Sequence, residues 1–354
     1  MSLNNGSSAV TRRRFLGAGL TGAAGIAAGC GSFKSGGAEG QDTSAKTYVN
    51  TVNGPLACED MGFTLPHEHI IVDWNGGDGK SMERYDPGEV FTIMYPYLRE
   101  IRLLGTQTFV DCTPPYLGRD VMVLRRLSIA TGLNIITNTG FYERPKAPAF
   151  AMTASEEELA DMFVKEIQGG IGDTGIYPGF IKIGVSNEGP MTDHDRRLVA
   201  AACRAHIETG LTINSHTFQG TSALEEIDII EREKVDPSKF VYVHAGFDPD
   251  VNYNIQAAER GVWIEFDSIR ADTRDKHVER ILTMLDKGFE DQLLISQDRG
   301  WYTVGAEKGG GINAYSYLQN VFLPYLLEKG IDEKLIYKLT VTNPARALAL
   351  KKVP

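Results

Sequence analysis

The sequence has few cysteines, no excess of positive charge and no long apolar run, and each absence excludes a class of protein. Its 354 residues include four widely spaced cysteines and no CxxC pair, which argues against a zinc ribbon and against a disulfide framework. The formal net charge of −10 argues against a nucleic-acid partner, because phosphate binding needs a basic face. No apolar run approaches the ~20 residues of a membrane-spanning helix.

The N-terminal segment has the pattern of an export signal. Three arginines at positions 12–14 precede Phe15 and a Gly/Ala-rich stretch, so residues 1–29 resemble a bacterial twin-arginine signal peptide. A disordered basic tail is the alternative. The letters Ala-Ala-Gly-Cys that end at Cys30 also resemble a lipoprotein cleavage box. We therefore expect a periplasmic protein or one with a lipid anchor at Cys30, followed by a flexible linker over residues 30–46.

Beyond the linker, short apolar runs alternate with segments of helical spacing. The runs predict eight strands, at 63–71, 107–113, 134–140, 179–186, 211–217, 240–246, 262–269 and 292–298. Ser155 and Thr192 precede acid-rich first turns, which predicts helices over 155–171 and 192–210.

Eight such repeats predict a closed (β/α)₈ barrel over residues 47–354, with a small β-hairpin within residues 47–62 ahead of it. An open doubly wound sheet is the structural competitor, but no GxGxxG follows the first strand.

Polar residues interrupt several of these apolar strands. A lone strand histidine is more often a hydrogen-bonded core residue than a ligand. Here, however, six polar residues lie on five strands, mostly near the carboxyl ends, where barrels place their chemistry. They are His67, His69, Lys182, His216, His244 and Asp298. The three other histidines, His194, His206 and His277, fall in helical segments and are expected at the surface.

This set of side chains is typical of a metal site. Four imidazoles and a carboxylate exceed the needs of one four-coordinate ion and suit two divalent ions, with Zn expected first and Mn, Co or Fe as alternatives. The ammonium group of Lys182 would repel both ions, whereas a carbamate formed from its neutral amine and CO₂ would offer an oxygen to each. A single ion beside an unmodified Lys182 is the alternative.

The ordered set of ligands resembles the phosphotriesterase family of the amidohydrolase superfamily, and so does the local sequence over about residues 47–351. The matching segments are 62–70, 170–184, 295–298 and 341–346. The resemblance implies a (β/α)₈ barrel that tends to dimerise and hydrolyses small-molecule substrates by attack of a metal-bridging hydroxide.

The resemblance also implies a role for each residue. His67, His69 and Asp298 would hold the buried metal and His216 and His244 the more exposed one, with carbamylated Lys182 between them. Asp298 would take the proton during attack and Asp267 would receive it onward, unless Asp267 is only a cap. Glu68, between the two histidines, is expected to face the other side of its strand in a structural role.

The substrate is less well defined by the sequence. Tyr142 stands where lactonase-like members of the family have a tyrosine, or it is an aromatic residue that lines the barrel mouth. Arg144, Arg299 and Trp301 are further candidates for substrate contact, although an ordinary surface role is open for Arg144. We expect hydrolysis of a lactone or carboxylic ester. The alternatives are an organophosphate triesterase and a non-catalytic binding protein with the same fold.

Overall fold

The computed structural model describes residues 46–142 and 146–351, which form mixed α/β structure. The predicted export signal at residues 1–29, the proposed anchor Cys30 and the substrate candidate Arg144 lie outside the described residues. Among the described residues, no helix has the length and apolar character needed to span a membrane.

The strands form two parallel sheets. One has six strands in the order β11-β10-β9-β8-β7-β6, and the other has four in the order β12-β3-β4-β5. The bounds are β3 Thr64–Val72, β4 Thr108–Asp111, β5 Asn134–Ile136, β6 Asn138–Thr139, β7 Phe180–Gly184, β8 Ile213–His216, β9 Phe240–Val243, β10 Trp263–Phe266, β11 Leu293–Ile295 and β12 Gly300–Thr303. Ahead of them, β1 (Tyr48–Thr51) and β2 (Gly54–Ala57) pair antiparallel. The prediction of parallel strands separated by helices is confirmed.

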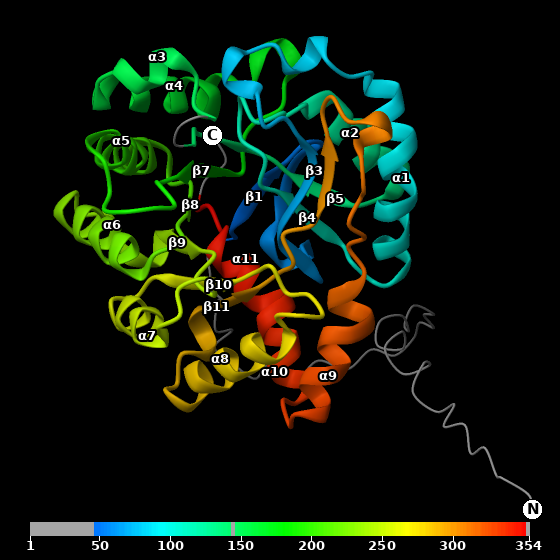
Figure 1. Ribbon diagram of the computed structural model, residues 1–354, viewed down its shortest axis with the longest axis vertical. Helices are drawn as coiled ribbons and strands as arrows, with labels where there is room; N and C mark the ends of the chain where they lie inside the picture. The colour runs from blue at the N-terminus through cyan, green and yellow to red at the C-terminus, as the bar shows by residue number, and fades with distance from the viewer. Residues whose placement is uncertain (1–45, 143–145, 352–354) are drawn as a thin grey trace, which may run out of the picture. The chain divides into compact units, whose positions relative to one another are not determined.

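The helices lie around the strands, which occupy the centre of the view in Figure 1. Their bounds are α1 Pro87–Leu103, α2 Val121–Thr131, α3 Ala149–Thr153, α4 Glu156–Gly169, α5 Asp193–Thr209, α6 Gly220–Arg232, α7 Val251–Glu259, α8 Arg274–Asp286, α9 Leu323–Glu328, α10 Glu333–Tyr337 and α11 Asn343–Ala347. Ser155 and Thr192 begin α4 and α5 as predicted, because each forms a reciprocal capping box with the residue three positions on.

The two faces of the strands have different neighbours. On β7, Ile181 and Ile183 pack in the large apolar core beneath the helices, whereas Phe180 packs with Met61 and Val110 on the other face. Since side chains alternate along a strand, Lys182 lies on the same face as Phe180, away from the helices. Glu265 and Trp263 share that face of β10 by the same alternation, because Ile264 and Phe266 belong to the helix-covered core.

The two sheets adjoin at two places. Only Thr137 separates β5 from β6, and β3 contacts β11. The backbone N–H of Asp298, just after β11, donates to the carbonyl oxygen of His67 on β3 at 3.1 Å.

The segment after Asp298 contains a strand that is not among the eight predicted from apolar runs. Residues 300–303 form β12, which pairs with β3 in parallel register. Gly300 makes this pairing possible, since its φ is +102° and an added Cβ would lie 1.9 Å from the carbonyl oxygen of His69.

The prediction for the helical histidines was wrong for two of the three. His194 and His277 are buried, while His206 is half-buried. His277 packs near Phe266, with its ring edge beside Gly246, and His194 lines a cavity at the start of α5. The helical spacing of the sequence did not show that the first turns of α5 and α8, which contain these two histidines, face the core.

Candidate metal centre

The six predicted ligand residues come together at the carboxyl ends of the parallel strands. His67 and His69 lie within β3, Lys182 within β7 and His216 at the end of β8. His244 and Asp298 come just after β9 and β11, in left-handed conformations with φ of +62° and +53°. Such backbone values are uncommon for residues other than glycine, and they persist only where the surroundings impose them.

His67 and His69 each have their Nδ1 atom held by a buried acceptor. His67 Nδ1 lies 2.6 Å from Glu265 Oε1, and His69 Nδ1 lies 2.8 Å from the hydroxyl oxygen of Thr113. The Thr113 hydroxyl itself donates to the carbonyl oxygen of Ile71, so it must accept from His69. Both rings therefore hold their proton on Nδ1 and present the lone pair of Nε2.

His216 and His244 adjoin, with ring centroids 4.4 Å apart. His244 Nδ1 lies 2.6 Å from Asp267 Oδ1, which leaves its Nε2 free, whereas His216 Nε2 lies 2.9 Å from Asn187 Oδ1, which leaves its Nδ1 free. Burial, followed by the charges of nearby cations, lowers the pKa of both His67 and His216 well below the ordinary value. Neutral imidazoles are the form that binds metal.

Lys182 is fully buried, and its Nζ has no hydrogen-bond partner among the described residues. The centre of the Tyr142 ring lies 5.9 Å from Nζ. A buried ammonium without a partner is costly, so the side chain needs either a neutral form or an additional group.

Asp298 directs a carboxylate oxygen toward the histidine pair of β3. Its Oδ1 lies 3.2 Å from His69 Nε2 and 3.8 Å from His67 Nε2. Burial would raise the pKa of Asp298, but the contact with His69 and the nearby His244 and Lys182 outweigh it and lower that pKa. These three residues form one group of possible ligand atoms within 4.8 Å of one another.

The donor set fits divalent metal ions. Three atoms of the predicted ligands are buried and have no hydrogen-bond partner among the described residues: His67 Nε2, Lys182 Nζ and Asp298 Oδ1. Imidazole nitrogens with a carboxylate oxygen are the ligands that Zn²⁺ and related ions prefer.

Comparison with known families agrees with this geometry, since the model of the phosphotriesterase family matches residues 47–348. The chain belongs to the phosphotriesterase family. An aryldialkylphosphatase of Saccharolobus solfataricus is 29% identical over 82% of this chain and 96% of its own length. A phosphotriesterase homology protein of Mycobacterium tuberculosis is also 29% identical, over 84% and 96%. An N-acetyltaurine hydrolase of Bos taurus is 28% identical over 87% and 100%.

Asp267 lies behind His244 in this phosphotriesterase family member. Its Oδ2 accepts from the backbone N–H of His244 at 2.9 Å, and its Oδ1 accepts from the ring at 2.6 Å. Both oxygens thus hold a ligand histidine in place. Among the described residues, no hydrogen bond joins Asp267 to Asp298, and the contacts of Asp267 with His244 give it an orienting position. Its role as the onward proton acceptor stays a prediction.

The sequence interpretation missed three residues that contact the candidate ligand histidines: Thr113, Asn187 and Glu265. Thr113 and Asn187 lie in loops just after strands, where short polar residues are common and give no distinct signal. A signal did exist for Glu265. It is an acid inside an apolar run, two residues before Asp267, and therefore on the same face of its strand.

Glu68 faces away from the two histidines, as expected, but its contacts are extensive. It is fully buried, and its carboxylate accepts hydrogen bonds from the Ser296 hydroxyl and from the backbone N–H groups of Gln297 and Arg299. Glu68 thus fixes the turn on both sides of Asp298.

Two of the predicted substrate residues lie against the histidines. The Trp301 ring stacks on His69 with centroids 4.2 Å apart, and the Tyr142 ring lies 5.0 Å from that of His216. Arg299 does not, because its guanidinium lies over Tyr317, 5.4 Å from the ring centre.

Aromatic side chains surround the histidines on two sides. Trp74 stacks on Trp301 at 5.4 Å, and Phe218 stacks on Phe247 at 4.3 Å next to His216. Trp74 and Phe247 are exposed. This rim offers apolar surface to a ligand that reaches the metal centre.

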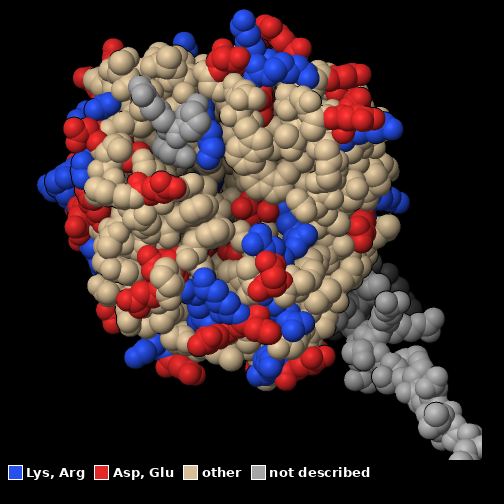
Figure 2. All heavy atoms as spheres, viewed as in Figure 1, with Lys and Arg blue, Asp and Glu red and all other residues tan. Residues whose placement is uncertain are grey.

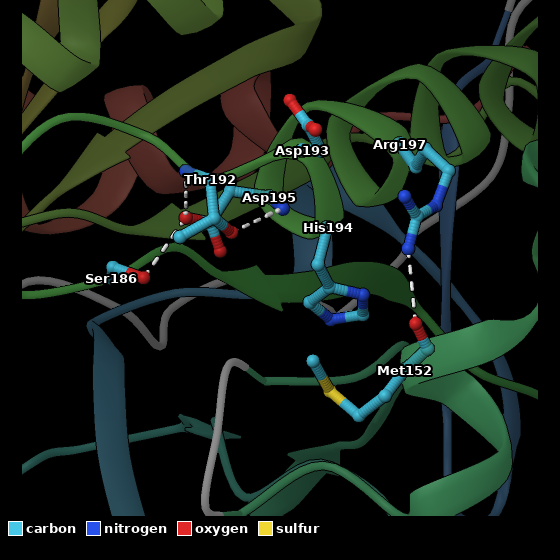
Figure 3. A pocket seen from close by; sticks show the side chains of 7 residues that line it. All are labelled: Met152, Ser186, Thr192, Asp193, His194, Asp195 and Arg197. Carbon is cyan, nitrogen blue, oxygen red and sulfur yellow. Dashed lines mark hydrogen bonds between the residues drawn. The ribbon is translucent and has the colours of Figure 1, made fainter.

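A cavity of about 330 Å³ lies at the start of α5. Figure 3 shows His194 projecting into it toward Met152, whose carbonyl oxygen accepts a hydrogen bond from Arg197. Ser186 lines the cavity, and its neighbour Asn187 contacts His216. None of the six predicted ligands lines it, so it lies beside the metal centre rather than over it. On the face shown in Figure 2, basic and acidic side chains are interspersed and form no basic patch.

Proposed function

We propose that this protein is a binuclear metal-dependent hydrolase of a lactone or carboxylic ester. One observation carries the proposal. Imidazole nitrogens from three strands or strand ends, an oxygen of Asp298 and the partnerless amine of Lys182 converge in one buried site. Membership of the phosphotriesterase family, whose relatives include named hydrolases, supports this chemistry.

His67, His69 and Asp298 would hold one ion, and His216 and His244 the other, with a carbamate on Lys182 contacting both. When bound, such ions lower the pKa of a water molecule and polarise the substrate oxygen. The paired polar groups behind the histidines keep the ligand nitrogens aimed at the site.

The chain's own residues would manage protons and water. Asp298 has a partnerless carboxylate oxygen at the site and would accept the proton of the attacking water. Trp301, Tyr142 and Phe218 would exclude bulk water from the histidines and position the substrate. Asp267 would keep His244 oriented throughout.

Phosphotriester hydrolysis is the second candidate, supported by the similarity to an aryldialkylphosphatase. The same site would serve both reactions, because each needs an activated water and a polarised oxygen. The similarity to an N-acetyltaurine hydrolase extends the candidates to N-acyl compounds.

The test is elemental analysis of the purified protein beside hydrolysis assays with lactones, paraoxon, aryl esters and N-acetyltaurine. We expect about two equivalents of metal and turnover of a lactone or ester. One equivalent with full activity would favour a mononuclear site. Failure to bind metal after reconstitution with bicarbonate would contradict the proposal and favour a non-catalytic protein.

The proposed fold is a single closed (β/α)₈ barrel. Its support is that one residue separates β5 from β6 and that β11 contacts β3. We further propose export by the twin-arginine route, with or without lipid at Cys30, and a homodimer. Mass spectrometry of the mature N-terminus and light scattering would test these points.

A further inference from the structure

Strand β10 and the residue after it contribute two buried carboxylates to the face that holds the candidate metal centre. Glu265 and Asp267 are two residues apart and therefore point to the same side. Glu265 Oε1 lies 2.6 Å from His67 Nδ1, and Asp267 Oδ1 lies 2.6 Å from His244 Nδ1. One short segment thus binds one histidine from each half of the proposed ligand set.

The contact of Glu265 has a definite effect on the ring of His67. A carboxylate accepts hydrogen bonds only, so Nδ1 must hold the proton and Nε2 must present its lone pair. That Nε2 is buried and has no hydrogen-bond partner among the described residues. A carboxylate behind an imidazole also raises its basicity toward a metal.

The contacts of Glu265 do not favour a role in fold stability. Its side chain is fully buried, and Oε2 has no hydrogen-bond partner among the described residues. A buried acid in this environment costs free energy in the metal-free protein, whereas a cation at the site would offset its charge.

We infer that Glu265 is a positioning residue of the metal centre, which fixes the tautomer and orientation of His67 and so sets the affinity of the metal bound there. Asp267 has the same role for His244 and the other metal. The inference rests on the proposed function, because it requires metal at both histidines.

The test is a cobalt(II) titration of metal-free protein followed by visible absorption and by competition with a chelator. The variants are Glu265→Gln, Glu265→Leu and Asp267→Asn, with the wild type beside them. We expect Glu265→Gln to weaken one of two binding steps by about 10–100-fold, and Glu265→Leu to weaken the same step further. Asp267→Asn should weaken the other step.

Thermal unfolding of the metal-free proteins separates positioning from a structural role. Glu265→Gln should unfold close to the wild-type temperature, because the amide keeps the size of the side chain and its oxygen can still accept from His67. Nitrogen-15 spectra of histidine in the metal-free protein give a further readout. A hydrogen-bonded Nδ1–H of His67 should be present in the wild type and absent in Glu265→Leu.

Three outcomes would overturn the inference. Unchanged affinities in both Glu265 variants of a protein that binds two metals would refute it alone and leave the proposed function intact. If Glu265→Gln and Asp267→Asn each weakened both metal-binding steps equally, the two carboxylates would act through their charge and not by positioning separate histidines. A wild type that binds no metal would refute the inference and the proposed function together.

Discussion

The carboxylate of Glu68 connects the strand of His67 and His69 to the turn of Asp298. Its Oε2 accepts from the backbone N–H of Arg299 at 2.8 Å, and its Oε1 accepts from the Ser296 hydroxyl at 2.9 Å. Because side chains alternate along β3, the tripeptide 67–69 provides two candidate ligands on one face and this connection on the other.

Replacement of Glu68 should destabilise the protein. Glu68→Ala leaves several buried donors around residues 296–299 without an acceptor, so we expect the free energy of unfolding to fall by about 2–4 kcal/mol. Glu68→Gln keeps the shape and one acceptor oxygen and should lose less. Urea unfolding of the metal-free proteins measures both. A loss below about 0.5 kcal/mol for Glu68→Ala would show that water satisfies these donors.

Removal of the Lys182 amine should remove one metal. Lys182→Ala eliminates the proposed bridging anion, so elemental analysis should give about one equivalent in place of two. Asn214→Ala is the matched control, because Asn214 pairs with Lys182 in the strand register and is also buried with a partnerless oxygen. Two equivalents in Lys182→Ala would rule out a bridging role.

Asp298→Asn should reduce kcat without loss of the fold. The amide keeps the shape of the side chain but cannot accept the proton of the attacking water, so a fall of about 10²–10⁴-fold is expected. Steady-state kinetics on the best substrate of the panel measures this. Asp291→Asn, at an exposed acid just before β11, should retain wild-type kcat. Full activity of Asp298→Asn would show that another group acts as the general base.

Gly300→Ala should be far more harmful than Gly305→Ala. Both glycines have positive φ, at +102° and +86°, but only at Gly300 would the new Cβ meet backbone, 1.9 Å from the His69 carbonyl oxygen. We expect a loss of about 3 kcal/mol or more at Gly300 and about 1 kcal/mol at Gly305, where no atom lies within 4 Å. Urea unfolding compares them, and equal losses would mean that β12 moves away from β3 at little cost.

Glu226 should make stability fall as pH rises above about 5. This buried acid contacts the hydroxyls of Ser215 and Thr217, and burial raises its pKa to about 8 from an ordinary 4.5. Between these values the folded state holds a proton that the unfolded chain has lost, so the free energy of unfolding decreases with pH.

The measurement for Glu226 is urea unfolding at pH 5.5 and 7.5. The wild type should lose about 1–3 kcal/mol more than Glu226→Gln over this interval, since each unit of pKa difference corresponds to about 1.4 kcal/mol. The same pH dependence in both proteins would assign it to other groups.

The strands and the grouping of the candidate ligands were predictable because they depend on local patterns. The sequence itself shows the apolar runs with period two, helix caps such as Ser155, and the polar residues that interrupt strands. The six candidate ligands do lie together in space. Their grouping needed only the rule that parallel strands end at one edge.

The contacts behind the ligands were not predictable to the same degree. Thr113 and Asn187 act through loop geometry, and β12 depends on a left-handed glycine against β3, which no periodicity reveals. The burial of His194 and His277 depends on how helices pack on the strands, and this is a tertiary property.

The backbone bonds between residues 67–69 and 298–300 have a consequence for assembly order. His69 N–H donates to the Arg299 carbonyl oxygen at 2.8 Å, and Asp298 N–H donates to that of His67 at 3.1 Å. The partners are more than two hundred residues apart, so this contact forms only after most of the chain has left the ribosome. A nascent or truncated chain that stops before Asp298 holds the two histidines of β3 without the carboxylate that lies beside them. The proposed metal centre can therefore be completed only when synthesis is nearly finished.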